Sequence, residues 1–161
     1  LNGTTVTPCA VGSLPGLLLN QYSMDIFQGH LRVATTIQSF WTTDASSGQP
    51  VWQFTTENQI VILEIPTITS SKTGEPAVFS EVGRIPHLGR EREIFTAVRF
   101  FDNVAYAVTF ERTDPFYVLD LSDPKNPTIL GELNVTGFSQ YLHSINDNNT
   151  LLVAVGQEAD E

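Results

Sequence analysis

The sequence predicts an all-β protein built from a repeated antiparallel unit of four short strands, and three observations support this prediction. Short apolar segments rich in β-branched and aromatic residues alternate with clusters of turn formers. The same succession of strands and turns recurs along the chain. The stretch 118–127, "VLDLSDPKNP", ends an apolar strand with two prolines, which suits passage to an outer strand, where a missing N–H does least harm.

Residues 95–135 contain the clearest copy of the unit. Its predicted strands are Phe95–Phe101, Val104–Phe110, Pro115–Leu121 and Thr128–Leu133. The pair Asp102–Asn103 forms the turn between the first two strands. Four antiparallel strands in about 40 residues correspond to one blade of a β-propeller. The sequence therefore predicts a propeller of four-stranded blades.

A second copy occupies residues 17–85, after an N-terminal segment or linker at 1–16. Its predicted strands are Gln21–Phe27, Leu31–Ile37, Gln59–Ile65 and Ala77–Val82. The copy is longer than one blade because of insertions at 39–57 and 67–75. Both insertions are rich in Ser and Thr, a composition typical of loops, so we expect loops there.

Residues 138–161 contain half of a third copy. The predicted strands are Phe138–Ile145 and Thr150–Gly156, and the turn before the second strand begins at Asp147, about 45 residues after the equivalent turn at Asp102. Two and a half blades cannot close a ring without leaving strand edges exposed. We therefore expect 17–161 to be part of a larger propeller, completed by the remainder of the propeller or by other copies.

Three segments resemble those of a known family. They are "LLLNQYSMDIFQGHLRVATT", "AVRFFDNVAYAVTFERTDPFYVLDLSDPKNPTILGEL" and "GFSQYLHSINDNNTLLVAVGQEADE". In this order they resemble secreted proteins with a C-terminal β-propeller domain, which are distantly similar to WD-repeat propellers. The resemblance covers Leu17 to Glu161 and implies a fold and an extracellular location, but no reaction. The two long insertions depart from the usual pattern of the family.

The charge of the chain limits its partners. The formal net charge is −10, and only 8 residues are Lys or Arg against 18 Asp or Glu. Nucleic acid and anionic membrane surfaces attract basic proteins, so neither is expected as a partner. No apolar run approaches the roughly 20 residues that span a bilayer, so no membrane insertion is expected.

Several residues indicate a secreted or cell-surface glycoprotein. The sequence begins at Leu1, which fits removal of a signal peptide or a start within a longer precursor. Acceptor triplets for N-glycosylation begin at Asn2, Asn134 and Asn148. Cys9 is the only cysteine. It is either a free thiol or the partner of a cysteine outside this chain, and we favour the disulfide.

The strongest candidate for a binding surface lies in the first insertion. Phe40, Trp41, Trp52 and Phe54 gather there among small polar residues. Aromatic side chains in such a setting can form a platform for an extracellular protein or a glycan. The alternative is that they pack the insertion back onto the blade. We expect a non-catalytic scaffold or binding module on this basis, and a cell-surface or filamentous assembly is a setting that such a module suits.

The sequence assigns no catalytic residue and no required cofactor. Asp147 lies in an Asn-rich turn whose oxygens suit Ca²⁺, but turn formation also explains the run. The alternative function is a propeller enzyme, a hydrolase or lyase with its site at the central channel. The predicted first strands offer Asp25, Arg99 and His143 for that role, and their separation in space distinguishes the two functions.

Overall fold

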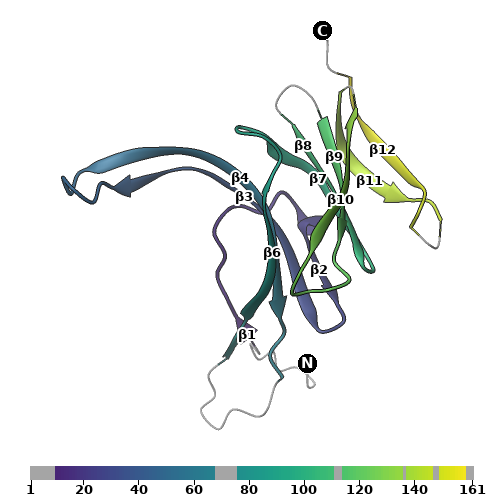
Figure 1. Ribbon diagram of the computed structural model, residues 1–161, viewed down its shortest axis with the longest axis horizontal. Helices are drawn as coiled ribbons and strands as arrows, with labels where there is room; N and C mark the ends of the chain where they lie inside the picture. Colours follow the sequence, from purple (N-terminus) through teal and green to yellow (C-terminus); the bar gives the residue numbers. More distant parts are fainter. Residues whose placement is uncertain (1–9, 68–75, 111–113, 136, 147–148, 159–161) are drawn as a thin grey trace, which may run out of the picture.

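The computed structural model describes residues 10–67, 76–110, 114–135, 137–146 and 149–158 (Figure 1). Within these ranges the chain forms two four-stranded antiparallel sheets, a two-stranded antiparallel sheet and a small two-stranded parallel pair. The two larger sheets have the strand orders β2-β3-β4-β6 and β10-β9-β8-β7. Each sheet thus follows the chain from one edge to the other, as a propeller blade does. This confirms the predicted fold class.

The first blade contains β2 (Met24–Phe27), β3 (His30–Thr43), β4 (Pro50–Glu64) and β6 (Ser80–Leu88). The predicted first strand was wrong in its first half, because Gln21–Ser23 forms a 3-10 turn, η1. The Asn20 side chain caps this turn by accepting a 2.9 Å hydrogen bond from the Tyr22 N–H. Asn offers the backbone this local alternative to a strand, and the turn places Tyr22 beside the blade.

The second blade contains β7 (Ile94–Phe101), β8 (Val104–Phe110), β9 (Asp114–Asp120) and β10 (Thr128–Val135). The half blade contains β11 (Phe138–Ser144) and β12 (Leu152–Gln157). The turns between the first and second strands each contain a non-glycine residue with positive φ: Gln28 (46°), Asp102 (46°) and Asn149 (55°). The repeat read from the sequence therefore recurs in the backbone of each unit.

A minor element was not predicted. β1 (Ala10–Val11) pairs in parallel with β5 (Ala77–Val78), so residues near the start of the described chain lie beside the fourth predicted strand of the first blade. The predicted strand Ala77–Val82 is accordingly divided between β5 and β6. Pairing with a segment so far away in sequence has no local signature.

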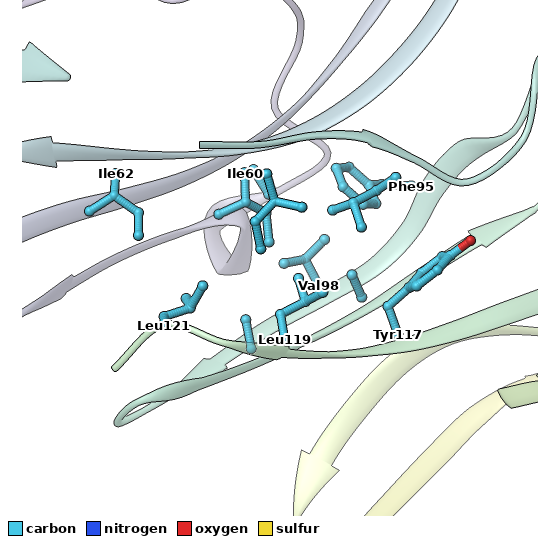
Figure 2. Close-up of a cluster of buried hydrophobic side chains, with 12 residues drawn as sticks. Ile60, Ile62, Phe95, Val98, Tyr117, Leu119 and Leu121 are labelled. Carbon is cyan, nitrogen blue, oxygen red and sulfur yellow. The ribbon is translucent and has the colours of Figure 1, made fainter. Parts of the chain in front are cut away.

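The main core lies between the first two blades (Figure 2). Ile60 and Ile62 of β4 pack on this side against Val98 and Leu119 of the second blade, and all four are at most 2% exposed. Val61, between the two isoleucines, faces the opposite side of the blade, where a second apolar cluster covers it. Both faces of β4 are therefore buried, which explains its continuous apolar run.

A smaller cluster joins the second blade to the half blade. Ala97 and Val108 pack there against Leu142 of β11, and each is at most 2% exposed. The partly buried rings of Tyr106 and Phe116 pack against the same cluster, with their centroids 5.8 Å apart. Successive units are thus held face to face by apolar side chains.

The stretch 118–127 turns the chain from β9 to the outermost strand, β10. The Asp123 carboxylate accepts hydrogen bonds from the Lys125 N–H at 2.9 Å and the Asn126 side-chain amide at 2.8 Å. Pro127 directly precedes β10, which pairs with β9 alone among the strands that the structure describes. A proline at this position removes no hydrogen bond from the interior of the sheet, as predicted.

Replacing Asn126 with alanine is expected to raise the pKa of Asp123. The hydrogen bond from the Asn126 side chain, followed by that from the Lys125 N–H, holds the pKa of this carboxyl below its usual value. The charged carboxylate therefore favours the turn above the unfolded pKa of about 3.9, and this contribution disappears as the pH falls through the lower folded value. A carboxyl-detected NMR titration measures the change. Asp120, whose pKa is lowered by Ser122 instead, is the internal control and should not shift.

Candidate functional site

The first insertion is an arm and not a loop. β3 and β4 continue beyond the first blade as a twisted two-stranded ribbon that projects away from the other strands (Figure 1). The loop prediction for residues 39–57 was wrong because Thr, Val, Trp and Phe in this stretch favour strands. The reversal is confined to residues 44–49, where the Asp44 carboxylate accepts hydrogen bonds from Ser46 and Ser47. These bonds, with the Ser46 hydroxyl foremost, hold the pKa of Asp44 well below its usual range.

Two of the four predicted aromatic residues form a pair near the tip of the arm. Trp41 and Trp52 lie directly opposite each other in the register of β3 and β4, so their side chains share one face. Their rings meet edge to face at 5.2 Å. Trp41 is 68% exposed and Trp52 is 42% exposed, so these two do not pack back onto the blade. Phe40 and Phe54 lie on the same strands, but their side chains fall outside the described part of the structure.

The arm also has two open edges. β2 pairs with β3 only as far as Val33, and β6 pairs with β4 only from Asn58 onward. In the described structure, residues 38–43 of β3 and 50–56 of β4 therefore pair with each other alone. Their outward N–H and C=O groups form two short edges that an extended chain can join.

A second candidate site is a cavity of about 340 Å³ between the units. It is lined by η1, β2, β7 and β11, that is, by the first strands of all three units and the turn before β2. The cavity brings together Asp25, Arg99 and His143, the three residues that the sequence suggested for a channel site.

Each of these three residues has its own partner. Asp25 forms an ion pair with the buried Arg32, whose Nε donates to the Asp25 carboxylate at 3.1 Å. His143 stacks on Tyr141, and its Nδ1 lies 3.3 Å from the Tyr141 hydroxyl. Arg99 donates from Nε to the Leu142 carbonyl at 2.7 Å. Among the described residues, no hydrogen bond or ion pair joins Asp25, Arg99 and His143 to one another.

Arg32 connects the strands that border this cavity. Its guanidinium lies between the Phe27 ring at 4.9 Å and the Phe100 ring at 5.2 Å, and it also donates to the backbone carbonyl of Asp102. One buried side chain thus ties β2 and β3 to the β7–β8 turn. The sequence did not single out Arg32, although an arginine on a strand with apolar neighbours is a signal for such a clamp.

The remaining predicted site residues are divided between described and undescribed parts. Asn134 is exposed on the outer strand β10. Asn2, Cys9, Asp147 and Asn148 lie outside the described residues. Within the described ranges, no three His, Cys, Asp or Glu side chains gather as a metal site would require. No helix in the same ranges is long and apolar enough to cross a membrane.

Comparisons with known proteins agree with the geometry. A family model described as "Beta propeller domain" matches residues 1–161. The chain is 40% identical over 148 residues to an uncharacterized protein of Archaeoglobus fulgidus, and the match covers 92% of the chain and 19% of that protein. It is 38% identical over 149 residues to an uncharacterized protein of Methanocaldococcus jannaschii, covering 92% of the chain and 20% of that protein. The chain thus spans about a fifth of the length of these relatives. No solved structure matches it significantly.

Proposed function

This chain belongs to the β-propeller domain family, and on that premise we propose that it is a non-catalytic binding and scaffold module whose arm engages a protein partner. The observation that carries the proposal is the exposed Trp41–Trp52 pair on a projecting ribbon. Tryptophan is enriched among the residues that contribute most to protein interfaces. The strand pairing orders both rings before binding, so little conformational entropy remains to be lost.

The open edges of the arm favour a protein over a glycan as the partner. An extended peptide can pair with the outer edge of β3 or β4, while the indole rings contact its side chains. A glycan would use the rings alone. An extracellular glycan therefore stands as the second candidate, supported by the exposed indole faces.

The half blade supports a further part of the proposal, that the remainder of the propeller or another copy completes it. In the described part of the chain β12 pairs with β11 alone, and its Val153 and Val155 are exposed, as is the preceding Leu151. Apolar side chains beside an unpaired strand edge favour the addition of further strands. The same addition between copies would build a filament or coat.

We propose an extracellular or cell-surface location on the basis of the resemblance described above and of the exposure of Asn134. Asn134 is exposed on β10, so a glycan attached there would extend into solvent. Mass spectrometry of the native protein tests this part separately, because it reports the mass of glycans on Asn2, Asn134 and Asn148 and the state of Cys9. Unmodified asparagines together with a reduced Cys9 would remove the support for secretion.

Replacing both Trp41 and Trp52 with alanine in the full-length protein is expected to weaken partner binding by at least about 30-fold, since a single buried interface tryptophan contributes roughly 2 kcal/mol or more. The thermal midpoint should hardly change, because both side chains are exposed. Affinity isolation from the extracellular fraction, followed by direct titration of the isolated protein or oligosaccharide, measures the loss.

The matched control is Thr42→Ala with Gln53→Ala. Both residues are exposed and each follows a tryptophan along its strand, so they lie on the opposite face of the arm. This control should bind like the unmodified protein. Equal binding by the tryptophan variant and the control would refute a role for the aromatic face, and a binder that proves to be an oligosaccharide would favour the glycan.

A further inference from the structure

We infer that the cavity between β2, β7 and β11 binds a small organic carboxylate through the guanidinium of Arg99. This site is separate from the arm and does not depend on the function proposed for it. The inference rests on a cation without a counterion, on the rigid placement of that cation, and on the groups that line the cavity beside it.

Arg99 differs from the other arginines that are withdrawn from solvent. Of the described arginines that are buried or half-buried, Arg32 is paired with Asp25 and Arg84 with Glu81. Arg99 is half-buried, yet no carboxylate forms an ion pair with it in the described part of the chain. Taking a charge from water without a partner is unfavourable, so this arrangement favours an anion beside Arg99.

The Arg99 side chain is also held in place. Its guanidinium carbon lies 3.2 Å from the centroid of the Tyr22 ring and 4.5 Å from that of Tyr141, and the two rings meet edge to face. The bond from Nε to the Leu142 carbonyl fixes the remaining rotation. Residues of η1, β7 and β11 thus position one guanidinium, while its two terminal nitrogens have no hydrogen-bond partner among the described residues.

The free part of the guanidinium determines the class of ligand. Its planar N–H groups match the two oxygens of a carboxylate in a bidentate pair. Asp25 is the acidic residue among the described residues that line the cavity, and Arg32 neutralises it. His143 lines the cavity beside Arg99, and about 340 Å³ suits a small molecule. A dianion such as phosphate is disfavoured, because a single unpaired cation faces it.

The experiment is calorimetric titration of the full-length protein with lactate, acetate and inorganic phosphate. Lactate and acetate are expected to saturate one site, with phosphate at least about tenfold weaker. Arg99→Lys keeps the charge but loses the planar fork, so it should weaken lactate binding by roughly tenfold or more. Arg90→Lys, at an exposed position away from the cavity, is the matched control and should bind lactate normally.

A second measurement needs no variant and therefore remains decisive if Arg99→Lys does not fold. Arginine-directed dicarbonyl modification, read by mass spectrometry, should be slowed by lactate at Arg99 and not at Arg90. The inference is overturned if lactate binds without saturation, if phosphate binds as tightly as lactate, or if lactate leaves the modification of Arg99 unchanged. A carboxylate from elsewhere in the protein that already occupies Arg99 would give this last result.

Discussion

Replacing Asn58 with alanine is expected to lower the free energy of unfolding by about 3–5 kcal/mol, because buried polar groups left without partners cost roughly 1–3 kcal/mol each. Asn58 is 1% exposed. Its amide nitrogen donates to the carbonyls of Leu88 and Glu93, both at 2.9 Å. Its oxygen accepts from the Thr36 hydroxyl at 2.7 Å and from the Phe95 N–H at 3.2 Å.

The size of this effect follows from what Asn58 connects. The side chain joins strands β3 and β4 of the first blade to the segment that leads into β7 of the second blade. Glu93, 2% exposed in that segment, accepts from the Arg90 N–H at 2.9 Å and the Thr109 hydroxyl at 2.7 Å. Truncating Asn58 therefore leaves groups of both blades unpaired in a site that water does not reach.

Urea unfolding of the full-length protein, followed by circular dichroism, measures the change. Asn103→Ala is the matched control, since Asn103 is exposed in the β7–β8 turn and uses its backbone carbonyl, not its side chain, to hold Leu121. This control should stay within about 0.5 kcal/mol of the unmodified protein. A loss below 1 kcal/mol in the Asn58 variant would contradict the role assigned to the network.

Replacing Gly83 with alanine is expected to destabilise the protein by about 2–3 kcal/mol, the upper part of the usual range for overfilling a packed contact. Gly83 lies in β6, and a methyl group there would fall inside contact distance of the Pro124 carbonyl oxygen and 3.0 Å from Pro127 Cδ. Both prolines belong to the turn between β9 and β10. The atoms in the way are backbone and a proline ring, so the two blades would have to separate.

Gly131→Ala is the matched control for this prediction. Gly131 also lies in a strand, β10, and nothing lies within 4 Å of a methyl group added there. This variant should be neutral or slightly stabilised, because alanine restricts the unfolded chain. Thermal or urea unfolding of both variants separates the effects. Equal stability of the two variants would show that the contact between β6 and the turn is not close.

Much of the fold was predictable because its signals are local. The strands of the second blade were predicted to within about two residues, since alternating apolar residues and turn formers act over short stretches. The turn 118–127 contains its own hydrogen-bond partners and was predicted for the same reason. Two of the errors were also local: Asn20 capped a 3-10 turn, and the β-branched and aromatic residues of 39–57 outweighed the loop-like serines and threonines.

The candidate sites likewise contain residues that the sequence could predict and residues that it could not. The aromatic residues of the arm were found from the sequence because they lie close together in it. The sequence also named Arg99, but not its tyrosine partners, which belong to neighbouring units. The sequence did not identify Asn58, although an asparagine just before the apolar run of a strand was the available signal.

The sequence by itself determined that this protein is a series of four-stranded antiparallel units with a defined order of strands and turns. Only the tertiary structure decided which side chains meet between those units: Asn58 with Leu88 and Glu93, Gly83 with Pro124, and Arg99 with Tyr22 and Tyr141. The physical reason is the range of the interactions. Strand formation depends on neighbouring residues, whereas burial, ring contacts and the absence of a counterion depend on how separate blades pack.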